Sequence, residues 1–193
     1  MVGSWRVGNR CLAGMTRRLD ANGDTSTQHV NATLEDMTME EIISFVDGLD
    51  GVLTQRAHSG DGSPEIAWGD TFFYYAPDGV VPGATQPFAT IVTKNYPGDE
   101  TSGLERAGVF RVNMAAGKEA FIAHIGRAPR ETDPDVAADA PAPDALDAVI
   151  AHPVYGSLGW LAVNNPGPAT SAEVRRLLQQ AHHLARARYL RRN

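Results

Sequence analysis

The chain has 193 residues, of which 42% are hydrophobic, and a formal net charge of −6 at pH 7. This length suits one domain with a sizeable core, and no apolar run approaches the ~20 residues that a membrane-spanning helix needs. A single cysteine excludes an internal disulfide framework and fits a reducing compartment, so the sequence predicts a soluble cytoplasmic protein without a membrane segment.

The first part of the chain carries little folding information. Residues 1–36 show neither a hydrophobic period nor the apolar centre of a signal peptide, so we expect a disordered extension before a domain at 37–193. Thr38 and Glu41 then match a capping box, and apolar residues follow at helical spacing, which predicts a short amphipathic helix. A strand over 52–55 follows it.

The central third of the domain has the period of β-strands. A hairpin is predicted over 65–79, and further strands over 88–94 and 108–114. Within the hairpin, Phe72 to Tyr75 place aromatic side chains on alternate faces, so we expect both faces of the sheet to be covered.

The last third returns to helical patterns. A helix is predicted over 118–125, and the proline-rich acidic stretch 127–145 reads as a surface loop. A turn at 152–156, a strand over 158–164 and a long closing helix that Thr170 or Ser171 caps complete the chain. This order predicts a single α+β domain whose mainly antiparallel sheet carries helices on one face.

Four blocks of this sequence suggest a family. The segments AWGDTFFYYAPDG, TIVTKNYPGD, RVNM and HPVYGSLGWLAVNNPG resemble an uncharacterised family of small bacterial proteins, which is similar in pattern to the MmcQ/YjbR-like group. The resemblance covers about residues 39–190. It implies a compact α+β fold of the CyaY-like, "double-wing" kind, for which DNA binding has been proposed and no general catalytic motif is known.

Polar residues on two of the predicted strands form the first candidate site. Lys94 ends one strand, whereas Arg111 and Asn113 share the face of another strand opposite its apolar side. If the strands are neighbours, the side chains of Lys94, Arg111 and Asn113 converge. Two cations and an amide placed together can bind a small organic anion. In the alternative interpretation, the two cations are solvated or pair with Asp70 and Asp99.

His152 is the candidate general acid or base, because imidazole titrates near neutrality. An enzyme acting on a small anionic metabolite would use it together with Arg111 or Lys94. The alternative is structural, since a histidine before a proline at a turn can bond to nearby backbone. Asp70, in a Gly-Asp pair, similarly fits an Asx turn better than a catalytic acid.

Aromatic residues with polar tips form a third group. These side chains are typical of the lining of a small-molecule pocket, and they are equally typical of a core. We expect no metal or cofactor, because the sequence has no cysteine cluster and no glycine-rich phosphate loop, and two adjacent helical histidines point about 100° apart. The aromatic candidates are Trp68, Tyr74, Tyr75, Tyr155 and Trp160.

The closing helix is basic in an otherwise acidic domain. From Thr170 onward, six arginines face a single Glu173. DNA binding through this helix is therefore an alternative function, although the acidic remainder argues against general nucleic-acid affinity. The leading hypothesis is a small ligand- or partner-binding protein without a recognisable catalytic motif. The arginines are Arg175, Arg176, Arg186, Arg188, Arg191 and Arg192.

Overall fold

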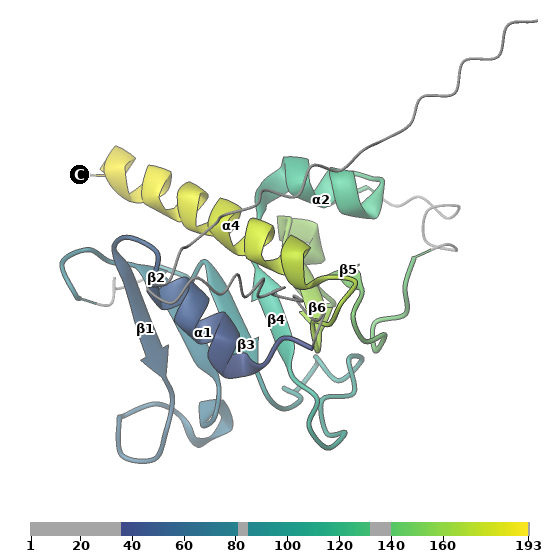
Figure 1. The fold of residues 1–193 in the computed structure, drawn as a ribbon, viewed down its shortest axis with the longest axis horizontal. Coiled ribbons are helices and arrows are strands. Elements are labelled where there is room, and N and C mark those ends of the chain that lie inside the picture. The colour runs from purple at the N-terminus through teal and green to yellow at the C-terminus, as the bar shows by residue number, and fades with distance from the viewer. Residues whose placement is uncertain (1–35, 81–84, 132–139, 193) are drawn as a thin grey trace, which may run out of the picture. The chain divides into compact units, whose positions relative to one another are not determined.

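A computed structural model of the chain describes residues 36–80, 85–131 and 140–192 (Figure 1). In these ranges six strands form one antiparallel sheet in the order β1-β2-β3-β4-β6-β5, and three α-helices pack on one face of it. The predicted α+β domain is thus confirmed. Residues 1–35, which include nearly all of the expected extension, lie outside the described residues. Within the described ranges, no helix is both long and apolar enough to cross a membrane.

The elements are short apart from the last helix. The helices are α1 (Met39–Asp47), α2 (Gly117–Ile125) and α4 (Ser171–Arg192). The strands are β1 (Val52–Arg56), β2 (Thr71–Tyr75), β3 (Ala89–Val92), β4 (Arg111–Met114), β5 (Val149–Ala151) and β6 (Leu161–Asn164). Two 3₁₀ turns, η1 (Glu65–Ala67) and η2 (Gly156–Leu158), lie in the connections.

The register of the strands sorts their side chains into two faces. Thr90 of β3 pairs with Asn113 of β4, and Ile91 pairs with Val112. Because successive side chains point to opposite faces, Ile91 and Val112 join the core beneath the helices, and Thr90 and Asn113 lie on the other face. Phe73 is likewise in the core. The alternation of side chains along each strand therefore determines which residues face away from the core and can form a site.

The helices close the core through apolar stripes. In α4, Val174, Leu177, Leu178 and Ala181 are fully buried, as their spacing predicts. The capping box at the start of α1 is also confirmed: Thr38 N donates to Glu41 Oε2 over 2.8 Å, and the side chain of Thr38 accepts from Glu41 N.

Two expectations about local structure are corrected. The stretch before β2 is the 3₁₀ turn η1 rather than a strand, because Pro64 starts a tight turn, so β2 forms its hairpin with β1. The strand predicted over 158–164 begins only at Leu161, and the three-residue edge strand β5 is too short to show a period.

Asp147 holds the start of α4 in place. Its carboxylate accepts hydrogen bonds from the backbone N–H groups of Gly167, Ala169 and Thr170 at 2.7–2.9 Å, and from the Thr170 hydroxyl at 2.6 Å. Burial acts to raise the pKa of Asp147, but these hydrogen bonds outweigh it and bring the pKa below its ordinary value. The carboxylate thus satisfies N–H groups that lack partners within the helix.

Replacing Asp147 should destabilise the fold. We expect Asp147→Ala to lower the free energy of unfolding by about 1–2 kcal/mol, because the helix loses its cap. Because the folded pKa is lowered, this contribution is present above the ordinary carboxyl pKa and is lost as the pH falls through the folded value. Urea unfolding at pH 7 measures the loss. Asp144→Ala, an exposed aspartate nearby, is the control, and equal losses in the two variants would contradict the capping role.

Candidate functional site

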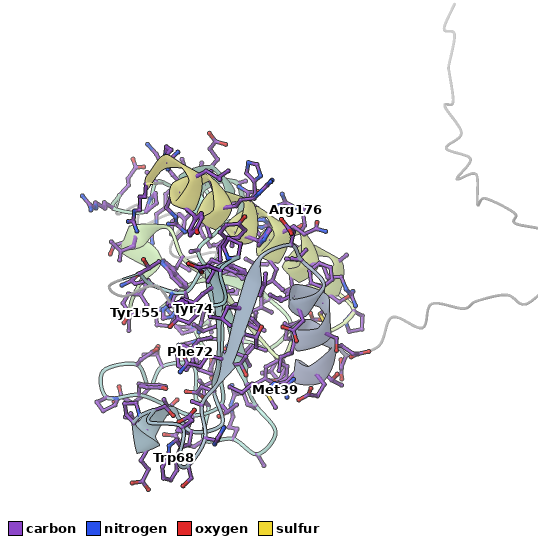
Figure 2. The ribbon with its side chains drawn as sticks, turned by 90° about the vertical axis from the view of Figure 1, so that its left-hand side faces the viewer. Met39, Trp68, Phe72, Tyr74, Tyr155 and Arg176 are labelled. Carbon is purple, nitrogen blue, oxygen red and sulfur yellow. The ribbon has the colours of Figure 1, made fainter. Side chains whose placement is uncertain are left out.

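The face of the sheet opposite the helices holds a pocket of about 580 Å³. Side chains of β2, β3 and β4 that point away from the core form its floor, and the loops after β3 and β5 form its walls. Figure 2 shows Phe72, Tyr74 and Tyr155 on the side of the strands opposite Met39 of α1. The helices therefore fill one face of the sheet, and the pocket occupies the other.

A buried ion pair lies at the base of this pocket. Arg111 is 1% exposed, and its Nη1 and Nη2 atoms donate to the two carboxylate oxygens of Asp99 over 2.9 and 2.5 Å. Nη1 also donates to Ser102 Oγ over 2.8 Å. Burial acts to raise the pKa of Asp99, but the hydrogen bonds and charge of Arg111 outweigh it and lower the pKa. The pairing of Arg111 with Asp99, one of the two interpretations of the sequence, is the one observed.

Asn113 extends this network across the sheet. Its Oδ1 accepts from Arg111 Nε over 2.8 Å, and its Nδ2 donates to Thr90 Oγ1 over 2.9 Å. β3 and β4 are neighbours, so Thr90 lies beside Asn113 on the face that Asn113 shares with Arg111. Because each group bonds to the next, hydrogen bonds within the protein hold the polar floor of the pocket in place.

His152 lines the same pocket and is almost fully buried. Its Nδ1 accepts hydrogen bonds from the backbone N–H groups of Val154 at 3.1 Å and Tyr155 at 3.2 Å. Burial and then the charge of Arg111 lower the pKa of His152 to about 4, although Asp99 opposes them. The ring is therefore neutral at pH 7 and carries its proton on Nε2, which makes it a hydrogen-bond donor.

Two aromatic rings pack together beside this histidine. The ring centroids of His152 and Tyr155 are 4.9 Å apart, and Trp160 lies 6.3 Å from His152 and 6.1 Å from Tyr155. Trp160 is buried, whereas Tyr155 is 45% exposed and stands at the rim. This cluster forms an aromatic wall on one side of the pocket.

Lys94 and Asp70 do not line the pocket. β3 ends at Val92, so Lys94 no longer follows the alternation of the strand, and its ammonium group donates to the carbonyl oxygens of Ile66 and Trp68. The expected convergence of Lys94 with Arg111 is thus not observed. Asp70 is fully buried and accepts from Thr93 N, from the Thr93 hydroxyl and from the Tyr96 hydroxyl.

Trp68 and Tyr75 also lie elsewhere. Trp68 donates from Nε1 to the carbonyl oxygen of Ser63 over 3.3 Å, and Tyr75 packs on the helix side against His182 and Tyr189 of α4. Of the candidate residues named from the sequence, the pocket thus brings together Tyr74, Arg111, Asn113, His152, Tyr155 and Trp160.

Several residues that line the pocket were not among the candidates predicted from the sequence. Thr90 and Val92 precede and follow a core residue on β3, so the same period that placed Asn113 would have found them once the register was known. Tyr96 lies in the loop after β3, as does Asp99, which the sequence offered as a partner for Lys94 or Arg111. A loop has no side-chain period, so no local signal placed Tyr96 at the pocket.

The sequence of this domain matches a known protein family. A family described as a family of unknown function, DUF6194, matches residues 37–193. No curated protein and no solved structure matches the chain. Because the family match spans most of the sequence and all of the elements described above, the chain belongs to the DUF6194 family of unknown function.

Proposed function

We propose that this protein binds a small organic molecule in the pocket on the open face of the sheet. The supporting observation is the combination of a volume of about 580 Å³ with aromatic walls and a floor of buried, mutually bonded polar groups. Small-molecule sites are concave, mostly apolar and largely preformed, with a few polar groups that orient the ligand. The face opposite the helices has these properties.

The polar floor favours a neutral part of the ligand over a charged one. Arg111 already makes both of its terminal contacts with Asp99, so an anion placed there would have to displace a buried carboxylate. His152 offers an N–H donor at Nε2, and Thr90 offers a hydroxyl group. A flat ring with a hydrogen-bonding edge suits these groups and the aromatic wall.

The enzyme alternative gains less support from this geometry. A general base needs an unprotonated nitrogen that faces its substrate, but Nδ1 of His152 is occupied by two backbone N–H groups. With its pKa lowered to about 4, the ring is neutral near pH 7. Its one N–H proton, on Nε2, then belongs to a neutral imidazole, which is a very weak acid. We therefore assign His152 to ligand orientation.

DNA binding remains a second candidate. It rests on the resemblance to the bacterial, cytoplasmic MmcQ/YjbR-like proteins and on Arg188, Arg191 and Arg192, which have no carboxylate within ion-pair distance in the described part of the chain. Affinity for a DNA duplex should then fall steeply as salt rises from 50 to about 200 mM. An absence of binding at low salt excludes this function.

A thermal-shift screen with aromatic and heteroaromatic metabolites tests the main proposal. We expect at least one compound to raise the Tm of the wild type, and Phe72→Ala to weaken its binding roughly tenfold, because one aromatic ring of the pocket floor is worth about 1–2 kcal/mol. Phe45→Ala is the matched control, because Phe45 is also partly buried but packs on the core side. Calorimetric titration gives the Kd of each variant. If both substitutions weaken binding equally, or if no compound binds, the pocket is not the site.

A further inference from the structure

A second hollow adjoins the sheet-face pocket. It has a volume of about 450 Å³ and lies between α4 and the segment that leads into β3. Gln86, Pro87 and Trp160 line both hollows, so the two share a wall. Arg188 and Arg192 of α4 line only the second. A ligand long enough to pass Trp160 would therefore meet two guanidinium groups.

Within the described residues, the arginines at this end of α4 have no counter-charge, in contrast to three arginines elsewhere. Arg111, Arg56 and Arg176 each pair with a carboxylate. No described carboxylate lies at ion-pair distance from Arg188 or Arg192, and the side chain of Arg192 makes a 3.3 Å hydrogen bond to the Thr85 hydroxyl.

Arg188 lies close to two other arginines. Partial burial lowers the pKa of Arg188, and the nearby charges of Arg192 and Arg191 lower it further. Repulsion of this kind is relieved when an anion binds between the cations, and a guanidinium group offers paired N–H donors to a carboxylate, phosphate or sulfonate. The second hollow therefore has the charge and the donors of an anion subsite.

We propose that the ligand is an amphipathic organic anion whose flat apolar body lies in the sheet-face pocket and whose anionic group passes Trp160 to contact Arg188 and Arg192. This inference rests on the proposed function and specifies the chemistry of its ligand. The sequence suggested that Lys94 and Arg111 contact an anion. In this proposal Arg188 and Arg192 make that contact instead.

Two dyes that differ only in a sulfonate group test the inference. 8-Anilinonaphthalene-1-sulfonate carries the anion, and N-phenyl-1-naphthylamine has the same rings without it. Fluorescence titration at constant ionic strength should show tighter binding of the sulfonate, and Arg188→Ala with Arg192→Ala should weaken it by about 10- to 100-fold. Binding of the neutral dye should change less than twofold.

The control removes the same net charge from the same helix. Arg175→Ala with Arg186→Ala, two exposed arginines outside both hollows, should leave the affinity for the sulfonate within about twofold of the wild type. Arg188→Lys with Arg192→Lys keeps the charge and should retain part of the affinity. Circular dichroism checks that each variant is folded.

The outcomes separate the inference from the proposed function. If the neutral dye binds and depends on Phe72, but the sulfonate gains nothing from Arg188 and Arg192, the anion subsite is wrong and the pocket stands. If the control pair weakens the sulfonate as strongly as the test pair, the effect is one of general charge, which also overturns the subsite. If neither dye binds, the proposed function fails.

Discussion

Arg111→Ala is expected to lower the free energy of unfolding by about 3–5 kcal/mol, the largest effect of any substitution at the pocket. Arg111 is buried, and its removal leaves the Asp99 carboxylate without its two N–H donors and the Asn113 and Ser102 oxygens without theirs. The loss of a partner from a buried pair costs more than the pair itself contributes, because the remaining charge is poorly solvated. Urea unfolding at pH 7 gives the value.

An exposed ion pair in the same protein is the control. Arg56 and Glu40 also form two hydrogen bonds of 2.9 Å, but their side chains are 52% and 70% exposed. Arg56→Ala should cost only about 0.2–1 kcal/mol. The double variant Arg111→Met with Asp99→Leu should be more stable than Arg111→Ala, because no charge is left unpaired. If Arg111→Ala costs no more than Arg56→Ala, the guanidinium is not held by the fold and is available to a ligand.

The site residues that lie on strands could be predicted from the sequence. A period of two residues assigns Arg111 and Asn113 to the face opposite Val112 and Met114, and the structure shows the same division. The stripe of α4 was equally clear, because a helix of 22 residues repeats its pattern several times. The pattern of apolar and polar side chains repeats along a helix or a strand, so it can be recognised from the sequence alone.

The position of the loop after β3 could not be predicted from the sequence, although Asp99 was one of the partners considered for Arg111. Asp99 reaches Arg111 because the chain after β3 folds back, and Asp70 fixes this segment by accepting from Thr93, 23 residues away, and from Tyr96. Lys94 looked like a strand residue because the pattern does not show where β3 ends. Such contacts depend on tertiary packing, which no window of neighbouring residues contains.

The acid sensitivity of the fold should depend on His152. Its pKa is lowered to about 4, whereas an unfolded histidine titrates near ~6.5. Between these pH values the unfolded chain takes up a proton that the folded protein does not. The free energy of unfolding is therefore highest above the unfolded pKa and falls as the pH is lowered to about 4. At ~1.4 kcal/mol per pH unit, the loss is about 3 kcal/mol. Urea unfolding at several pH values between 7 and 4 measures it.

A variant that keeps the turn but cannot titrate isolates this contribution. In His152→Asn the side-chain oxygen takes the place of Nδ1 and can still accept from the N–H groups of Val154 and Tyr155. The variant should be less stable at pH 7, because the ring contacts with Trp160 are lost, but it should lack the decline above pH 4. His183→Asn, at an exposed position of α4, should retain that decline. The pKa values of Asp99 and Asp147 are lowered, so their contributions to stability are constant above the ordinary carboxyl range and are lost only below it, outside this window.

The same titration decides what His152 can do for a ligand. A decline that vanishes in His152→Asn means that the folded protein holds a neutral ring at pH 7, with Nδ1 bound to the backbone and the proton on Nε2. Ligand affinity should then be constant between about pH 6 and 8, since no group of the pocket floor changes its charge there. A decline that persists in the variant, together with an affinity that changes with pH near neutrality, would instead show a histidine that exchanges protons and would favour the enzyme alternative.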